Sequence, residues 1–250
     1  MNTMKTQTVL ITGGGSGMGR ASAQALAKLG IHVFIGDINL AAAEETADLV
    51  RKAGGEADGF SVDISQSKSV IELFSQIRKK TERLDMLVHT AAIAGNIAFL
   101  EDLTDADWQK MLDINLTGTF FCAREAVRAM KDNKTGRIVL FSSVASLIPT
   151  PGAIHYSAAK GAINMFGKTL ALEASKYNIR VNVIAPGYIE TPMMKGMKGM
   201  EGFLESIAKK TPLKRFGQPE EIASLVAYLA TDEADFMTGQ VISMNGGLVI

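Results

Sequence analysis

Residues 8–19 read Thr-Val-Leu-Ile-Thr-Gly-Gly-Gly-Ser-Gly-Met-Gly, a short β-branched run followed by a glycine-rich turn. A helical pattern continues from this turn to Leu29, and a second strand-like run begins at Ile31. Between a strand and a helix, glycines let the chain turn tightly and let helix N-terminal N–H groups approach a pyrophosphate. An ordinary loop is the alternative, because a glycine cluster alone is weak evidence. The stretch predicts a β-α-β unit with a candidate phosphate site.

The same alternation continues to the C-terminus. The expected strands are 8–12, 31–35, 57–62, 84–89, 137–142, 180–185 and 240–244. Helical patterns end at Leu29 and Ala53, span about 66–81, 105–131 and 219–230, and include the segment that carries residues 156–160. Strands separated by helices form a parallel sheet covered on both faces, because right-handed crossovers place the helices there. No linker-like segment interrupts the pattern, so we expect one α/β domain over residues 1–250, a doubly wound (Rossmann) parallel sheet of about seven strands.

The composition excludes several classes of function. The 250 residues include 26 basic and 26 acidic side chains without a block of like charges, which argues against a nucleic-acid partner. Cys122 is the only cysteine, so no internal disulfide can form, and no spacing typical of a metal site is present. There is no signal-like N-terminus and no run of the ~20 apolar residues that a membrane span needs. We therefore expect a cytoplasmic protein without a membrane partner.

Asp37 ends the second expected strand, twenty residues after Gly17. An acidic side chain there can accept hydrogen bonds from both ribose hydroxyls of an adenosine, and it would repel a 2′-phosphate. No Arg or Lys stands at positions 36, 38 or 39, and Ser16 adds no positive charge before Gly17. A turn residue at a strand end is the alternative. The pattern favours NAD over NADP.

Tyr156 and Lys160 are four residues apart, and Ser143 precedes Tyr156 by thirteen. Residues four apart share one helical face, so the Lys160 ammonium can favour the ionised form of the phenol. A tyrosine that exchanges protons near neutral pH is a general acid or base, although an ordinary surface pair would show the same spacing. A serine nucleophile is disfavoured, because Ser142 and Ser143 lack a nucleophile-elbow sequence and a recognisable His–acid pair.

These motifs occur in the order and at the intervals of the short-chain dehydrogenase/reductase family, which the chain resembles nearly from end to end. Thr12-Gly-x-x-x-Gly-x-Gly19 resembles the cofactor motif of that family, and Tyr156-x-x-x-Lys160 resembles its catalytic motif. The catalytic residues that the resemblance implies are Asn115, Ser143, Tyr156 and Lys160. The cofactor-binding residues that it implies are Gly13, Ser16, Gly17, Met18, Gly19, Asp37, Asp63, Ile64, Ala91, Tyr156, Lys160, Pro186, Gly187, Ile189 and Thr191.

The resemblance implies hydride transfer between NAD(H) and a secondary alcohol or ketone. Tyr156 would be the general acid or base, with its pKa lowered by Lys160 and the positive nicotinamide together, and Lys160 would also bind the nicotinamide ribose. Ser143 would hydrogen-bond the substrate oxygen, and Asn115 would help to hold a water chain. Reduction of a 3-oxoacyl thioester (ACP or CoA) is a second interpretation, although in the family it usually goes with NADPH. A catalytically silent NAD-binding scaffold is a third, which the presence of all four catalytic residues disfavours.

Two positions depart from the family pattern. His89-Thr90 stands where the family usually has Asn-Asn, which leaves the contacts of that loop open, and Asn245 stands where Asp is common. We interpret His89 as a satisfied core residue rather than a ligand, because it ends a buried strand. Asn245 has no functional explanation from the sequence.

The segment at about 190–216 corresponds to the substrate lid of the family. Its methionines could form an adaptable apolar wall or simply pack the lid onto the body. Between Pro192 and Gly217, six basic residues stand against two acidic ones, an excess of four that would suit a carboxylate- or CoA-bearing substrate, or a solvated face. His155 could contact substrate or only cap its helix. The candidate substrate-binding residues are Ser143, Ala145, His155, Tyr156, Tyr188, Met193, Met194 and Met197. The resemblance also implies a homotetramer.

Overall fold

The computed structural model describes residues 7–196 and 201–250. Seven strands form one parallel sheet in the order β3-β2-β1-β4-β5-β6-β7. They are β1 (Thr8–Thr12), β2 (His32–Asp37), β3 (Ala57–Ser61), β4 (Met86–His89), β5 (Gly136–Phe141), β6 (Ile179–Pro186) and β7 (Val241–Met244). The expected doubly wound, Rossmann-like sheet is confirmed, and the observed strand ends differ from the expected ones by at most two residues.

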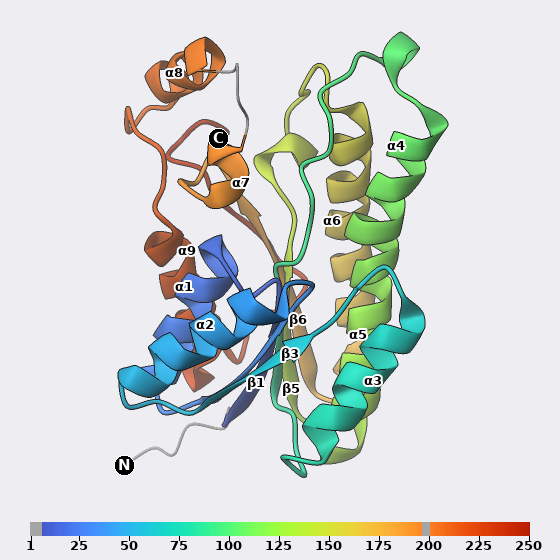
Figure 1. Ribbon diagram of the computed structural model, residues 1–250, viewed down its shortest axis with the longest axis vertical. Coiled ribbons are helices and arrows are strands. Elements are labelled where there is room, and N and C mark those ends of the chain that lie inside the picture. The colour runs from blue at the N-terminus through green and yellow to red at the C-terminus, as the bar shows by residue number, and fades with distance from the viewer. Residues whose placement is uncertain (1–6, 197–200) are drawn as a thin grey trace.

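Helices cover both faces of the sheet, as Figure 1 shows. One face carries α1 (Gly17–Ala27), α2 (Leu40–Lys52) and α9 (Pro219–Leu229), and the other carries α3 (Ser67–Arg78), α5 (Gly118–Met130) and α6 (Ile154–Ser175). Successive residues of β1 alternate between the two layers, with Val9 and Ile11 in one apolar cluster and Leu10 in the other. Burial on both faces explains why the strands read as continuous apolar runs.

The strand order reverses between β1 and β4, which are hydrogen-bonded neighbours with Thr12 opposite His89. The crossovers that follow β1 and β4 lead to opposite faces of the sheet, so their loops diverge at the carboxyl ends of the strands. In open α/β sheets this topological switch point is where ligands bind. The glycine-rich turn after β1 therefore lies at the expected position of a binding crevice.

Two helical segments differ from the sequence-based expectation. The helix expected over 105–131 is divided into α4 (Asp105–Met111), a π-helical segment η2 (Leu112–Thr117) and α5. The segment expected as the lid contains α7 (Pro192–Lys195) and α8 (Glu201–Lys210), for which the sequence pattern predicted no helix. The short 3₁₀ segments are η1 (Leu100–Asp102), η3 (Lys131–Asn133), η4 (Val144–Ser146) and η5 (Asp232–Ala234).

A buried cation lies at the amino-terminal ends of the strands, away from the switch point. Arg137 at the start of β5 is 3% exposed, and its guanidinium donates to Asp232 at 3.0 Å and to Asp235 at 2.7 Å. These carboxylates follow α9, so the contact fixes that helix to the amino-terminal edge of the sheet, away from the crevice. Across residues 7–196 and 201–250, every helix is too short or too polar to cross a bilayer.

Candidate active site

The glycine turn is packed so tightly that side chains are excluded from it. A Cβ on Gly19 would lie 2.3 Å from the carbonyl oxygen of Gly13, and Gly13 itself has a positive φ of 72°. Ser16 is the N-cap of α1 and makes no side-chain capping bond within the described residues. The first N–H groups of α1 are thus directed out of the helix at a turn without side chains, which fits a bound pyrophosphate.

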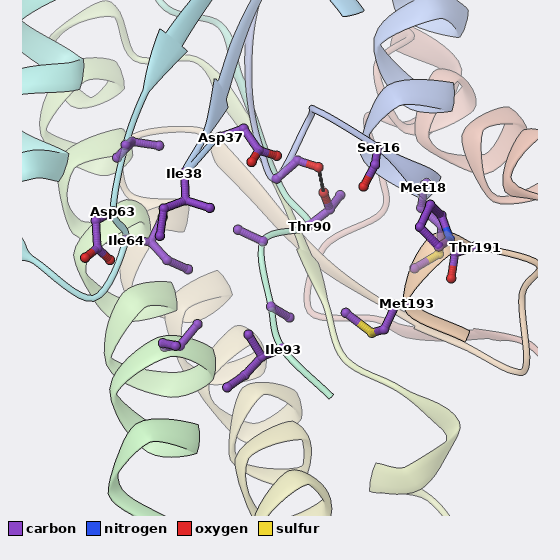
Figure 2. Close-up of a pocket in the computed structure, with 18 residues that line it drawn as sticks. Ser16, Met18, Asp37, Ile38, Asp63, Ile64, Thr90, Ile93, Thr191 and Met193 are labelled. Carbon is purple, nitrogen blue, oxygen red and sulfur yellow. Dashed lines mark hydrogen bonds between the residues drawn. The ribbon is translucent and has the colours of Figure 1, made fainter. Parts of the chain in front are cut away.

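A crevice of about 290 Å³ lies at the switch point, between the glycine turn and the loops that follow β2, β3, β4 and β6. Figure 2 shows Asp37, Ile38, Asp63 and Ile64 on one side of it, and Ser16, Met18, Thr191 and Met193 on the other. The cofactor residues predicted from the sequence that line the crevice are Gly13, Ser16, Gly17, Met18, Gly19, Asp37, Asp63, Ile64, Ala91 and Thr191. Its lining residues include members of the segments that follow β1, β2, β3, β4 and β6.

Asp37 faces this crevice from the end of β2. Its Oδ2 accepts a hydrogen bond from the Gly15 N–H at 2.9 Å, and its Oδ1 accepts one from the Asn39 N–H at 3.0 Å. A carboxylate has about four lone-pair sites, so each oxygen can still accept a hydrogen bond from a ribose hydroxyl. Both backbone contacts hold the carboxylate in one orientation toward the turn.

The two side chains that depart from the family pattern both contact β1. Thr90 donates its hydroxyl to the carbonyl oxygens of Thr12 at 2.8 Å and Gly13 at 3.2 Å, and so holds the glycine turn (Figure 2). His89 is 2% exposed, and its Nδ1 lies 2.7 Å from the Thr12 hydroxyl, whereas its Nε2 has no partner among the described residues. Burial, aided by the Lys160 ammonium, lowers the pKa of His89 to about 3, so the imidazole is neutral. His89 is a core residue, as interpreted, but only one of its ring nitrogens is satisfied.

Asn115 lies in the π-helical segment and is 1% exposed. Its Oδ1 accepts from the Ile93 N–H at 2.9 Å, and its Nδ2 donates to the Ile93 carbonyl at 2.9 Å. The side chain thus pairs with the backbone of the loop after β4 as a neighbouring strand would. Single-turn π segments are frequent at functional sites. Here the π turn brings Asn115 to the loop that lines the crevice.

Ser143, Tyr156 and Lys160 come together at the carboxyl end of β5. The Ser143 hydroxyl lies close enough to the Tyr156 phenol to favour its ionised form, and Ser143 Oγ accepts a hydrogen bond from the Ala145 N–H at 3.2 Å. Lys160 is 3% exposed, its Nζ donates to the Phe141 carbonyl at 2.8 Å, and Nζ lies 5.7 Å from the centre of the Tyr156 ring. The expected helical spacing therefore brings the phenol, the ammonium and the serine hydroxyl to one place.

The pKa values in this group follow burial first. Burial raises the pKa of Tyr156, the Ser143 hydrogen bond partly opposes this, and Tyr188 adds to the increase. Burial also lowers the pKa of Lys160 to about 8. The sequence predicts a lowered pKa of Tyr156 from Lys160 together with a positive nicotinamide. Among the groups of the protein itself, burial of the phenol dominates and raises this pKa, so the prediction depends on the charge of the cofactor.

Other residues predicted from the family resemblance lie outside the crevice. Pro186 is buried in β6, Gly187 packs against Asn245, and Ile189 is buried in the core beside α9. Tyr188 packs against Phe203 of α8 and Phe216, and so joins the lid to the body.

The predicted substrate residues are divided in the same way. Met193 lines the crevice, Met194 is half-buried in α7, and Ala145 is buried beside Ser143. Met197 lies outside the described residues. His155 is the second residue of α6 and fully buried, so it is neither a cap nor exposed to the crevice.

Several residues that line the crevice were not predicted. They are Ile38, Val62, Thr90, Ala92, Ile93, Ile114 and Pro192, whereas Met193, which also lines the crevice, was predicted for substrate. Ile38 is 74% exposed directly after Asp37. An apolar residue that follows the acidic end of β2 is a signal that could have identified it, whereas Ile93 and Ile114 depend on the π segment and leave no such signal.

Asn245, unexplained from the sequence, organises the C-terminal segment. Its Oδ1 accepts from the N–H groups of Gly247 at 2.8 Å and Val249 at 3.3 Å, and its Nδ2 donates to Ser243 at 2.6 Å and to the Val249 carbonyl at 3.0 Å. The donor half of the amide is needed for two of these bonds. A carboxylate could not donate them, so the role of Asn245 is structural.

Comparison with known proteins agrees with this geometry. A family model described as enoyl-(acyl carrier protein) reductase matches residues 13–249. A 3-oxoacyl-[acyl-carrier-protein] reductase of Synechocystis is 36% identical over 255 residues and 100% of both chains, and glucose 1-dehydrogenase 2 of Bacillus subtilis is 34% identical over 98% of this chain and 95% of its own. The crystal structure of a short-chain type dehydrogenase/reductase from Mycobacterium marinum superimposes with a TM-score of 0.92 at 31% identity, over 97% of this chain and 95% of that one. The chain belongs to the short-chain dehydrogenase/reductase family.

Proposed function

We propose that the protein is an NAD-dependent oxidoreductase that interconverts a secondary alcohol and a ketone, and that residues 1–250 form one catalytic domain. The observation that carries this proposal is the group at the end of β5. There the Ser143 hydroxyl favours the ionised form of the Tyr156 phenol, and a buried Lys160 ammonium lies 5.7 Å from the centre of its ring. A phenol, a hydroxyl donor and a cation at one point match the needs of proton transfer to a substrate oxygen.

The residues of the crevice fit a dinucleotide. The N–H groups at the start of α1 would hold the pyrophosphate, Asp37 would accept the adenosine ribose hydroxyls, and Asp63-Ile64 would lie at the adenine end. Thr191 and Met193 line the opposite side, where we place the nicotinamide end. A bound nicotinamide would supply or accept the hydride. Because Asp37 is fixed by two backbone bonds with no basic residue beside it, we propose NAD rather than NADP.

The catalytic group would manage one proton. Tyr156 would take the alcohol proton during oxidation and return it during reduction, and Ser143 would orient the substrate oxygen. Lys160 would provide positive charge beside the phenol, and its remaining N–H groups would bind ribose hydroxyls. Since burial alone raises the pKa of Tyr156, the phenolate needs further positive charge at the site. Asn115 would keep the loop after β4 in position through Ile93.

The lid supports a moderately apolar substrate better than an anionic one. Arg215 donates two hydrogen bonds to Glu221, at 2.6 Å and 2.7 Å, so its charge is already paired. Lys214 donates to the Lys209 carbonyl at 2.6 Å. One of the basic side chains of the lid is thus neutralised by a carboxylate of α9, and a second is held by a backbone carbonyl. Reduction of a 3-oxoacyl thioester remains a second candidate, because full-length relatives such as the Synechocystis protein are named as reductases of that class.

A homotetramer belongs to the same proposal. Large apolar side chains are exposed on the outer faces of α5 and α6, where Phe120 is 42%, Met165 63% and Leu172 80% exposed. Apolar groups exposed together on helices indicate an interface. Sedimentation that gives a monomer at micromolar concentration would remove this part of the proposal.

The test is a rate measurement with both cofactors. Reduced nucleotide formation is followed across cyclic, aliphatic, aromatic and CoA-linked secondary alcohols, with NAD⁺ and with NADP⁺. Tyr156→Phe should lower kcat by at least about a hundredfold and leave the NADH dissociation constant unchanged. Tyr177→Phe, a tyrosine after the end of α6, is the matched control. Substantial turnover by Tyr156→Phe would refute the catalytic role, a preference for NADP⁺ would refute the cofactor, and activity on CoA compounds alone would favour the second candidate.

A further inference from the structure

Arg20 joins the glycine turn to α2 through a single guanidinium group. Its Nη2 and Nε donate to the Gly15 carbonyl at 2.6 Å and 3.1 Å. Nε also donates to the Thr46 hydroxyl at 3.0 Å, and Nη1 and Nη2 donate to Glu45 at 3.2 Å and 2.7 Å. Thr46 is fully buried, so the guanidinium is anchored to a fixed point on α2.

The other polar group of the same glycine is used by Asp37. The Gly15 N–H donates to Asp37 Oδ2 at 2.9 Å, while the Gly15 carbonyl accepts from Arg20. A Cβ on Gly15 would lie 2.8 Å from both Asp37 Oδ2 and the Ala42 side chain, so the backbone passes close to both elements. A glycine has few intrinsic restraints on its backbone angles. Its orientation here is therefore set from both sides by hydrogen bonds.

Asp37 itself depends on these contacts. Its two oxygens accept from Gly15 and from Asn39, and Asn39 in turn caps α2 through Ala42. If the Gly15 backbone rotated, Oδ2 would lose its donor and the carboxylate could turn about its terminal torsion. Paired acceptance of two ribose hydroxyls requires a fixed carboxylate plane, whereas repulsion of a phosphate requires only the charge.

We infer that Arg20 is a positioning residue for nicotinamide nucleotide selection, acting on Asp37 through the backbone of Gly15. Arg20 is not among the described residues that line the crevice, so we expect it to act through Gly15 rather than by contact with the nucleotide. The inference rests on the proposed preference for NAD. It predicts that the strength of ribose recognition, and with it the discrimination between the two nucleotides, depends on a guanidinium behind the turn.

Arg51, which lies in α2, provides a matched control for Arg20 of α1. Its guanidinium also donates to a backbone carbonyl, that of Ala57, at 2.6 Å, and pairs with Asp48 at 2.6 Å and Glu44 at 3.4 Å. It joins α2 to β3 rather than to the turn. Arg20→Gln and Arg51→Gln therefore remove comparable contacts, and only the first involves Gly15.

The experiment measures dissociation constants for NADH, NADPH and 5′-AMP by calorimetry, together with urea unfolding of each variant. For Arg20→Gln we expect NADH and 5′-AMP to bind about tenfold more weakly, equivalent to about 1.4 kcal/mol, and NADPH to change by less than about threefold. The KM for NAD⁺ should rise while kcat stays within about twofold. Arg51→Gln should lower the urea midpoint and leave all three dissociation constants unchanged.

Equal weakening of NADH and NADPH by Arg20→Gln, or the same weakening by Arg51→Gln, would overturn the inference, since either result indicates general loosening. Should Arg20→Gln fail to fold, Glu45→Gln keeps the guanidinium and its bond to Thr46 but removes its ion pair with α2, and Glu44→Gln is its control. Weaker NADH binding in Glu45→Gln alone supports the inference, and identical behaviour of these two variants overturns it. The wild-type protein reports separately on the proposed function, because a preference for NADPH would refute the cofactor choice and the inference that rests on it.

Discussion

Lys160 should make the folded protein less stable while it makes the site active. The side chain is 3% exposed, and burial lowers its pKa from the usual 10.5 to about 8. One pKa unit corresponds to about 1.36 kcal/mol, so keeping the ammonium charged in the folded protein at pH 7 costs about 3 kcal/mol. Lys160→Met removes this cost and keeps a side chain of similar length. Loss of the hydrogen bond to the Phe141 carbonyl destabilises the variant by about 1 kcal/mol, so the free energy of unfolding should increase by about 2 kcal/mol in total.

The pH dependence gives the sign of the effect. Between pH 8 and pH 10.5 the unfolded chain still binds the Lys160 proton and the folded chain does not, so wild-type stability rises with pH in this window. At pH 10 the remaining cost is about 1 kcal/mol, and the lost hydrogen bond cancels it. The variant should thus be more stable than the wild type at pH 7 and about equally stable at pH 10.

The assay is urea unfolding at pH 7 and pH 10, followed by circular dichroism. At pH 7 the variant should also melt about 4–8 °C higher, as about 2 kcal/mol implies for a chain of this size, and its kcat should fall by at least about a hundredfold. Lys168→Met replaces an exposed lysine on the same helix and should change neither quantity. A Lys160→Met protein that is less stable at pH 7, or whose advantage does not shrink by pH 10, would refute the reasoning.

Two further substitutions distinguish an effect on nucleotide binding from an effect on the stability of the fold. Gly19→Ala places a methyl group 2.3 Å from the Gly13 carbonyl oxygen and 2.7 Å from the Thr90 hydroxyl, so the turn must shift. NADH binding measured by calorimetry should therefore weaken by more than about tenfold. Unchanged NADH affinity would show that the turn can yield. Arg137→Leu removes a buried cation from two partly exposed carboxylates and should lower the free energy of unfolding in urea by about 3 kcal/mol. Its kcat and KM should stay at the wild-type values, because Arg137 lies at the opposite edge of the sheet from the crevice, and a large change in kcat would contradict that separation.

The sheet could be predicted because its strands are buried on both faces. A strand such as β1 then appears as an uninterrupted β-branched run, and the glycine turn after it marks the start of the following helix. The proximity of Tyr156 and Lys160 could also be predicted, since α6 is a regular helix in which residues four apart lie on one face. Local geometry decides these features, so a local pattern is sufficient to find them.

Features that depend on distant contacts could not be found in this way. The π segment around Asn115 exists where that side chain pairs with Ile93, a residue 22 positions away that no periodicity connects with it. The same contact places Ile93 and Ile114 on the wall of the crevice. The effect of burial on the Tyr156 pKa could not be predicted for a related reason, because it depends on how deeply the phenol is buried, and helical spacing indicates only which residues are neighbours.

The replacement of the usual Asn-Asn by His89-Thr90 shows what the loop after β4 must provide. The Thr12 carbonyl accepts from the Thr90 N–H at 3.0 Å, and the Thr90 hydroxyl adds a donor that is shared between the carbonyls of Thr12 and Gly13. A hydroxyl and an amide N–H can each fill that role, so the turn keeps its shape although the residues differ. Lys160, by contrast, is a charged side chain that is buried, so it destabilises the fold. We attribute its presence to the proton transfer at Tyr156. Substitution should therefore be tolerated after β4 wherever a donor remains, and should abolish turnover at position 160 even where the fold gains stability.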